Sequence, residues 1–159
     1  MCLLLQPAPA ADLAEKGMAL MKTESLDGIR LEMPQSEVLK ALGKPAKKGQ
    51  DIEWEAIGEF VQEWRFPDHG LVLNMTSIKK GAAKTVFSVA LIPPGKQGTK
   101  KGIHLGSTEA EVGKAYGALR DPDSSEKGKT FVVGSLYGGL VFTFEKGKVV
   151  GIFLGASAE

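Results

Sequence analysis

The chain has 159 residues, with 20 Lys and Arg against 19 Asp and Glu, and a formal net charge of +1. A charge this balanced gives no long-range field that would favour nucleic acid or an anionic membrane surface as a partner. Cys2 is the only cysteine, which excludes an intrachain disulfide and a cysteine-based metal site. With only His69 and His104 besides, we expect no bound metal and no cofactor. No stretch approaches the ~20 apolar residues of a membrane span.

The N-terminal residues 1–12 are similar to the end of a secretory signal, with three leucines and then an Ala-Pro-Ala stretch ahead of a polar helix. The apolar part is too short for a complete signal. A start assigned too far downstream and a frayed terminus therefore both stay open. We expect a periplasmic or secreted protein, with a cytoplasmic one as the alternative. From Ala11 to Met21, good helix formers surround the apolar residues, which predicts a short helix with Asp12 as its N-cap.

A sixteen-residue stretch occurs twice in the chain. Residues 28–43 and 102–117 align without a gap at an offset of 74, with eight identical positions. An internal repeat of this kind outranks other sequence signals for architecture. It divides the chain into a signal-like remnant and helix at 1–22, a first repeat at 23–93, a linker at 94–101 and a second repeat at 102–159.

In both copies, the shared residues begin, pack and end a helix. Pro34 suits the first turn of the first helix, where its missing N–H costs nothing. In the second copy, Thr108 with Glu111 fits a capping box, while Ser107 is the alternative N-cap one residue earlier. The two copies therefore predict a helix at the same place by different means.

After each helix, the spacing of apolar residues changes from about 3.6 to about 2, which predicts half-buried strands in antiparallel hairpins. The expected strands are residues 51–56, 60–66, 71–76, 85–92, 130–133, 139–144 and 149–154. The predicted fold class is α+β, with two tandem repeats, each a short helical segment packed on an antiparallel β-sheet. The two sheets could be continuous and concave.

Alternation along the strands separates an apolar face, expected to meet the helices, from a mixed face accessible to solvent. It places Phe87 and Val150 on the apolar face. Val86, Val149 and Phe153 fall on the exposed face.

The order of a Gly, a hydrophobic residue, a short polar step, Glu-Val and a helix ending in Gly, then an antiparallel sheet, resembles the repeat of the β-lactamase inhibitor protein. In single copy, the unit is similar to the small outer-membrane assembly lipoprotein family. The resemblance covers about residues 28–154. It implies two helix-plus-sheet units whose sheets join into one concave surface that grips another protein through aromatic and polar side chains. The chain lacks the inhibitor's cysteines, so disulfides are not expected here.

Large aromatic side chains dominate interface energetics, so aromatic residues are the candidate protein-binding residues. They are Trp54, Trp64, Phe66, Tyr137 and Phe153. Alternation favours a core position for the first three and leaves the last two evenly divided between core and surface. The acidic residues Glu53, Glu55, Glu59 and Glu63 are interpreted as a solvated strand edge, with binding of a cation or a basic partner as the alternative.

We expect a non-catalytic protein-binding module of the cell envelope that binds another envelope protein through the exposed sheet face. The alternative is a small-molecule or lipid carrier with a cleft between the helices and the sheet. An enzyme would require Asp68 and His69 to converge in a cleft, and the sequence order offers no Ser-His-Asp or Cys-His arrangement. We therefore predict no catalytic residue, and the oligomeric state stays open.

Overall fold

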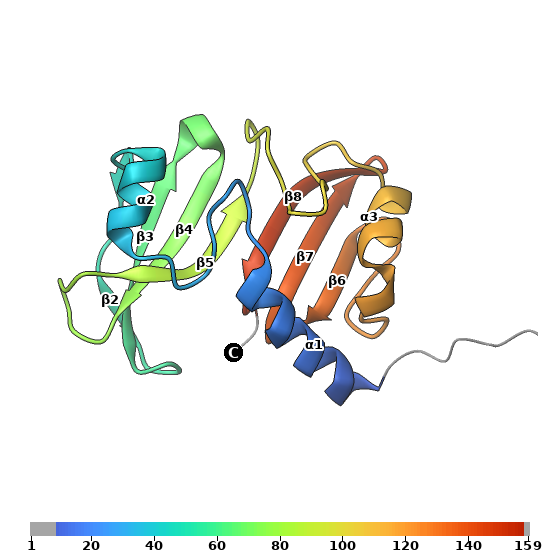
Figure 1. Cartoon of the computed structure of the whole chain (residues 1–159), viewed down its shortest axis with the longest axis horizontal. Coiled ribbons are helices and arrows are strands. Elements are labelled where there is room, and N and C mark those ends of the chain that lie inside the picture. The colour runs from blue at the N-terminus through green and yellow to red at the C-terminus, as the bar shows by residue number, and fades with distance from the viewer. Residues whose placement is uncertain (1–8, 158–159) are drawn as a thin grey trace, which may run out of the picture.

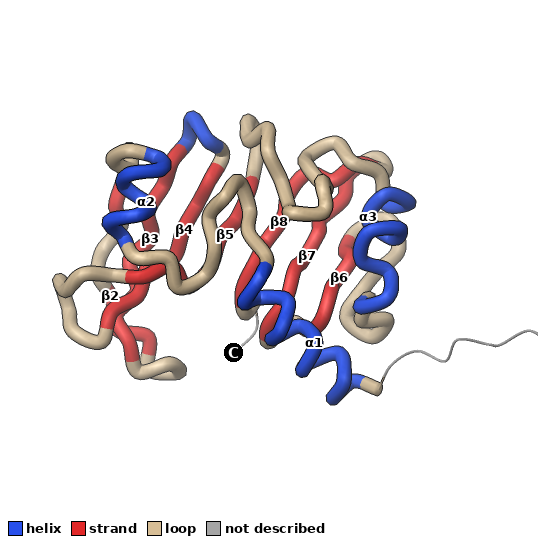
Figure 2. Tube along the Cα trace, viewed as in Figure 1, coloured by secondary structure: helices blue, strands red, loops and turns tan. Residues whose placement is uncertain are grey.

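The computed structural model describes residues 9–157, in which three helices lie on one face of a single antiparallel sheet (Figures 1 and 2). The helices are α1 (Ala10–Thr23), α2 (Gln35–Leu42) and α3 (Glu109–Tyr116). Short 3-10 turns lie at Pro67–His69 and Gly117–Leu119. None of the helices in this part of the chain is long and apolar enough to cross a bilayer.

The sheet has eight strands and is not closed. They are β1 (Lys47–Lys48), β2 (Ile52–Trp54), β3 (Glu59–Phe66), β4 (Leu71–Ser77), β5 (Thr85–Leu91), β6 (Thr130–Ser135), β7 (Gly138–Glu145) and β8 (Lys148–Gly155). Their order is β1-β3-β4-β5-β8-β7-β6, with β2 also paired to β3. The predicted α+β class with an antiparallel sheet is confirmed, and one sheet runs through both halves of the chain. The tandem-repeat interpretation stays a prediction.

The two halves of the sheet meet where β5 pairs with β8, a contact that we call the seam. Three residue pairs form it: Val89 with Leu154, Ala90 with Phe153, and Leu91 with Ile152. Beyond these pairs the two strands separate, so the seam is much shorter than the pairing of β7 with β8. The two halves therefore diverge on either side of a short central contact.

The same backbone pattern covers the free strand edge on each side of the seam. In the first half, the N–H of Glu32 donates to the carbonyl of Val86 at 2.7 Å, and the N–H of Val86 donates to the carbonyl of Met33 at 3.0 Å. In the second half, Val149 makes the equivalent two bonds with residues 106–107, both at 2.8 Å. These bonds satisfy groups that an open edge would present to solvent. They also fix the loop that precedes each helix.

A β-bulge in each half changes which side chains face the helices. The register between β4 and β5 shifts at the bulge, so Val86 is buried and Phe87 is half-exposed. The β7–β8 pairing shifts in the same way, which buries Val149 and leaves Val150 half-exposed. The predicted placement of these four side chains was wrong because alternation assumes an unbroken pleat.

A single hydrophobic core lies between the helices and the sheet. Its deeply buried residues come from both halves and include Val38, Leu71, Leu73, Met75, Leu91, Val112, Leu140, Phe142 and Leu154. The ring of Tyr116 packs on that of Phe142, with centroids 5.6 Å apart. Helix α1 lies close to β6 and β7 because Gly17 faces them without a side chain. A Cβ at this position would collide with the carbonyl oxygen of Gly138.

A buried carboxylate, Glu24, joins the end of α1 to the linker and to α3. One oxygen accepts from the backbone N–H groups of Ser25 at 3.0 Å and Lys100 at 2.8 Å. The other accepts from the hydroxyl of Tyr116 at 2.8 Å. Burial raises the pKa of Tyr116, and the hydrogen bond to Glu24 raises it further. The phenol therefore stays protonated and continues to donate at neutral pH.

Glu24→Ala is expected to lower the free energy of unfolding by about 3 kcal/mol, because it leaves three donors without their acceptor. Urea unfolding followed by tryptophan fluorescence measures this change. Glu15→Ala, on the exposed side of α1, is the control and should change stability by less than about 0.5 kcal/mol. Equal stability of the two variants would contradict the role of Glu24.

Candidate functional site

Three aromatic side chains gather on the sheet face away from the helices. Phe153 of β8 lies between two smaller neighbours, Ala90 of β5 and Val141 of β7, and stays half-exposed. The rings of Trp54 and Phe87 meet edge to face, with centroids 6.1 Å apart. Phe87 reaches this position because of the bulge in β5. An aromatic surface therefore begins directly at the seam.

These aromatic residues line a depression of about 390 Å³ together with Ile57, Asn74 and Ala156. None of the eight described residues that line it carries a charge. Its location, beside the short β5–β8 contact, follows from the divergence of the two halves. A depression of this size and composition is typical of sites that hold an apolar group.

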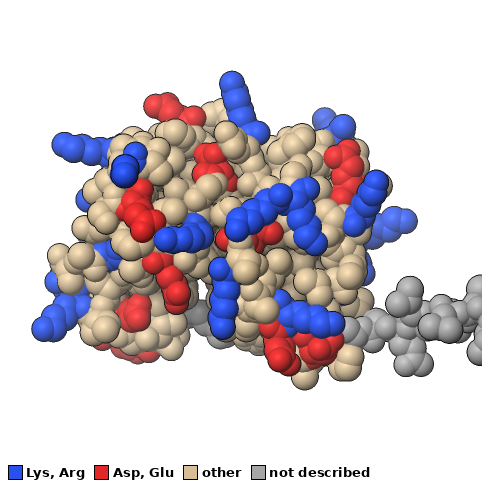
Figure 3. Space-filling view, viewed as in Figure 1, with Lys and Arg blue, Asp and Glu red and all other residues tan. Residues whose placement is uncertain are grey.

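A second depression, of about 600 Å³, adjoins the first and shares Ile57, Phe87 and Ala156 with it. Its other wall is formed by Met18 and Met21 of α1 and by Tyr137 in the β6–β7 turn. Met18 is 51% exposed and Tyr137 is 68% exposed. We call the two depressions together the seam groove. Figure 3 shows a notch between the two halves at the lower edge of the molecule.

Three charged residues line the wider part of the seam groove, namely Lys22, Glu32 and Glu59. Glu32 has a left-handed backbone with φ 64°. That conformation costs a non-glycine residue roughly 1–2 kcal/mol. Gly106, in the equivalent loop of the second half, has φ 94° at no such cost. The groove therefore includes a strained acidic residue.

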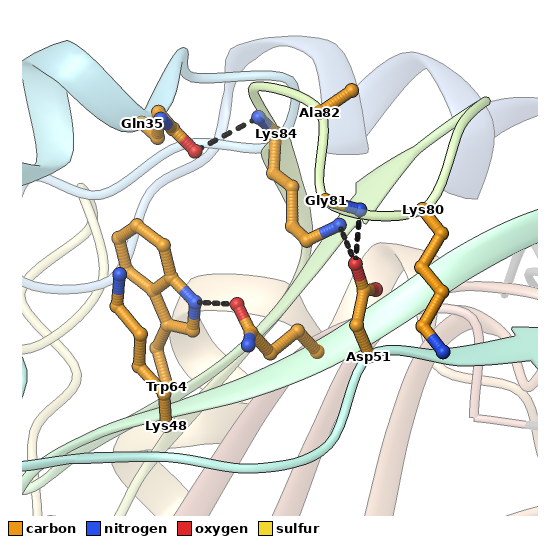
Figure 4. Close-up of a pocket in the computed structure, with 9 residues that line it drawn as sticks. Gln35, Lys48, Asp51, Trp64, Lys80, Gly81, Ala82 and Lys84 are labelled. Carbon is orange, nitrogen blue, oxygen red and sulfur yellow. Dashed lines mark hydrogen bonds and ion pairs between the residues drawn. The ribbon is translucent and has the colours of Figure 1, made fainter.

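A separate polar pocket of about 320 Å³ lies on the helix side of the sheet, near the start of α2 (Figure 4). It contains the ammonium groups of Lys48, Lys80 and Lys84 and the carboxylate of Asp51. The Lys48 ammonium lies 4.3 Å from the ring centroid of Trp64. The pocket therefore has a positive balance of charge.

Asp51 and Lys84 form a buried ion pair at 2.9 Å, with side chains 11% and 4% exposed. The oxygen of Asp51 that meets Lys84 also accepts from the N–H of Gly81 at 2.7 Å, as Figure 4 shows. Burial by itself raises the pKa of Asp51, but the Gly81 and Lys84 hydrogen bonds and the charges of Lys84 and Lys80 outweigh it and lower the pKa. The other oxygen is buried and has no hydrogen-bond partner within residues 9–157.

Lys84 also donates to the hydroxyl of Ser77 at 2.6 Å, and that hydroxyl donates to the carbonyl of Lys79 at 2.8 Å. A serine beside a lysine can act as a nucleophile only when the amine is free to accept its proton. Here the ammonium is held by ionised Asp51, and the serine proton points to a carbonyl. The arrangement fixes the loop between β4 and β5.

Asp68 and His69 are both exposed in the 3-10 turn before β4. They line an open depression of about 490 Å³ together with Asp27 and Lys96. Partial burial raises the pKa of Asp27, while the charge of nearby His69 acts in the opposite direction. The described residues that line this depression carry no hydroxyl or thiol group.

The structure brings three of the five candidate aromatic residues, Trp54, Tyr137 and Phe153, to the seam groove. Trp64 and Phe66 lie in the core, 1% and 3% exposed, because β3 directs them toward the helices. In this structure the two side chains offer almost no surface to a partner, so neither belongs to the seam groove. The expected core position was correct for them but not for Trp54, which is half-exposed.

The predicted acidic strand face separates into different environments. Glu53 and Glu55 are exposed, and Glu63 pairs with Arg65 at 2.6 Å. Glu59 lines the seam groove. Among residues 9–157, no three His, Cys, Asp or Glu side chains gather as they would around a metal ion.

Sequence reasoning missed Phe87, Met18 and Met21 as groove residues. Alternation predicts Phe87 on the apolar face that meets the helices, and the bulge in β5 turns it to the opposite face. Met18 and Met21 fall within the helix predicted from Ala11 to Met21, and the sequence carries no signal that this helix lies beside the groove.

The fold and the groove together define an α+β protein with an open antiparallel sheet and an aromatic groove where its two halves meet. No family model, curated protein or solved structure matches the chain. The resemblance to the β-lactamase inhibitor repeat therefore stays a prediction.

Asp51→Asn is expected to lower the free energy of unfolding at neutral pH by about 3 kcal/mol, the cost of leaving Lys84 buried without its partner. The folded-state pKa of Asp51 lies below its unfolded value. Its contribution is therefore present above about pH 4 and is lost as the pH falls from there toward the folded-state pKa. Urea unfolding of both proteins from acid to neutral pH should show the difference shrinking in acid.

The matched control for Asp51→Asn is Glu63→Gln, which breaks the exposed pair with Arg65. It should cost less than about 1 kcal/mol. A stability difference between wild type and D51N that does not vary with pH would contradict the assigned role of Asp51.

Proposed function

We propose that the protein is a non-catalytic binding module that holds a segment of another protein in the seam groove. The observation that carries the proposal is a groove, apolar in its smaller part and edged by charged residues in its wider part, with aromatic side chains from both halves of the sheet. Large partly exposed aromatic side chains, gathered in a concavity, are typical of the centres of protein interfaces.

The energetics favour the binding of an apolar surface in the groove. Tyr137 and Met18 are largely exposed at the edge of the groove, and the rings of Trp54, Phe87 and Phe153 lie deeper within it. Covering apolar surface is worth about 25 cal/mol for each Å² removed from water. Rings already held by packing lose little conformational freedom on binding, which leaves more of this energy as affinity.

We place the protein in the cell envelope, periplasmic or secreted, with another envelope protein as its partner. This part of the proposal is supported by the signal-like composition of residues 1–12, of which residues 1–8 lie outside the described part of the chain. The mode of binding is supported by the resemblance of the repeat to that of the β-lactamase inhibitor protein, which implies a sheet surface that grips another protein. A cytoplasmic location is the alternative.

A carrier of small anionic molecules is the second candidate function. The observation that favours it is the helix-side polar pocket, where Lys48, Lys80 and Lys84 outnumber Asp51. Two of these charged groups already neutralise each other as an ion pair. The pocket is polar, so it fits an anion better than the lipid that an apolar cleft would hold. It therefore ranks below the groove.

Tyr137→Ala and Phe153→Ala are expected to weaken partner binding by about tenfold or more, the effect of removing an interface anchor. Proteins captured from the envelope fraction of the native cell are identified by mass spectrometry. The partner so found is then purified, and its Kd is measured by biolayer interferometry. Tyr137 is exposed, so its removal does not threaten the fold.

Ile78→Ala is the control for both variants, because Ile78 is an exposed apolar residue that does not line the groove. Thermal unfolding checks that F153A remains folded. A partner that binds Y137A, F153A and I78A equally well would place its site elsewhere and end the proposal.

Isothermal titration calorimetry with inorganic phosphate and with citrate tests the carrier function. The carrier hypothesis requires heat of binding that Lys80→Met reduces by about tenfold, since one of the facing charges is lost. Absence of heat with either anion counts against this second candidate and leaves the first unaffected.

A further inference from the structure

We propose that the segment held in the seam groove carries a Lys or Arg side chain between apolar residues, and that Glu32 binds this cation. The inference rests on the proposed function and adds the chemistry of the partner to it. It follows from the backbone of Glu32, from the equivalent position in the second half, and from the balance of charge in the groove.

The left-handed backbone of Glu32 is imposed by the sheet. Its N–H donates to the carbonyl of Val86 at 2.7 Å, and the N–H of Val86 donates to the next residue of the same loop, Met33. Non-glycine residues rarely adopt φ near 64°. This backbone places the side chain in the wall of the groove, where Met21 and Tyr137 also lie.

The second half shows that the loop does not need a carboxylate. Gly106 makes the equivalent bond to the carbonyl of Val149 at 2.8 Å, with a backbone in the same left-handed region. Glycine adopts that region without strain. Where a non-glycine residue occupies this region despite the strain, its side chain often has a function. We assign the function of Glu32 to its side chain.

Charge in the groove is not balanced. Of the described residues that line its wider part, Lys22 carries the only positive charge, against Glu32 and Glu59. Neither carboxylate takes part in an ion pair within residues 9–157. Two acidic groups are thus available to a partner beside an apolar surface.

The carboxylates of Glu32 and Glu59 determine which charge a bound segment should carry. A purely apolar segment would cover them without pairing them, and leaving a charge desolvated and unpaired weakens binding. An acidic segment would be repelled. A Lys or Arg side chain supplies the missing charge, and its attraction grows as the partner excludes water from the groove. Apolar residues on either side then occupy the aromatic surface.

Selection of random peptides displayed on phage, with the full chain immobilised, tests this inference. Peptides selected on the wild-type protein should be enriched in Lys or Arg next to aromatic or aliphatic residues. On Glu32→Gln, the basic residue should lose its enrichment while the apolar residues keep theirs. For one selected peptide, E32Q should weaken binding about tenfold, but should not affect an analogue in which norleucine replaces the basic residue.

Glu32→Gly and Lys146→Gly form a matched pair. Lys146 also has a left-handed backbone, φ 51°, but lies in the β7–β8 turn and does not line the groove. Both changes relieve the same kind of strain, so neither should lower the midpoint of thermal unfolding by more than a few degrees. Only E32G should lose the selection for a basic residue.

The outcomes separate the two proposals. Selected peptides that are apolar without a basic residue, and whose binding depends on Phe153, overturn the role of Glu32 and leave the proposed function intact. Failure to select any peptide whose binding depends on Phe153 overturns the proposed function itself. A dimer of the chain that F153A dissociates would identify a second copy as the occupant and overturn the inference.

Discussion

The buried carboxylate of Glu24 is the constraint on which the placement of α1 depends. A carboxylate out of water is stable only when hydrogen bonds replace its hydration. Its donors come from Ser25 beside it, from Lys100 at a separation of 76 residues and from Tyr116 at 92. The charge is therefore satisfied only once distant parts of the chain have met. Because Glu24 directly follows α1, the same bonds help to position Met18 and Met21, which form one wall of the groove.

Two groups of charged residues differ in whether their charges are paired within the fold. On the helix side of the sheet, Asp51 and Lys84 satisfy one another and fix a loop, so their charge is internal to the fold. In the seam groove, Glu32 and Glu59 stay outside the ion pairs of the described chain. A charge that the fold does not use, beside an apolar surface that the fold does not cover, is the arrangement that gives an interface both affinity and selectivity.

The sequence allowed much of the fold to be predicted, because helix caps and strand alternation are local properties. Thr108 accepts from the N–H of Glu111 as the capping box requires, and the strands lie close to where alternation places them. The bulges could not be predicted, since they depend on pairing with another strand. Because the bulge in β5 was not predicted, Phe87, which lines both parts of the groove, was not recognised as a site residue. The groove itself arises from the meeting of two halves, which no local pattern encodes.

The seam has a property that follows from its register. The pairs of Val89 with Leu154 and of Leu91 with Ile152 lie on either side of Ala90 and Phe153. The residue that precedes Ala90 in β5 pairs with the residue that follows Phe153 in β8, and the residue that follows Ala90 pairs with the one that precedes Phe153. A local two-fold axis through the central pair therefore exchanges the two strand backbones. This is the geometry of an isologous dimer interface, formed within one chain. The surroundings of the axis are not symmetric, however, because the small Ala90 on one side faces the large Phe153 on the other. That difference in size gives the groove a direction, so an extended segment lying across the seam would meet different surfaces at its two ends.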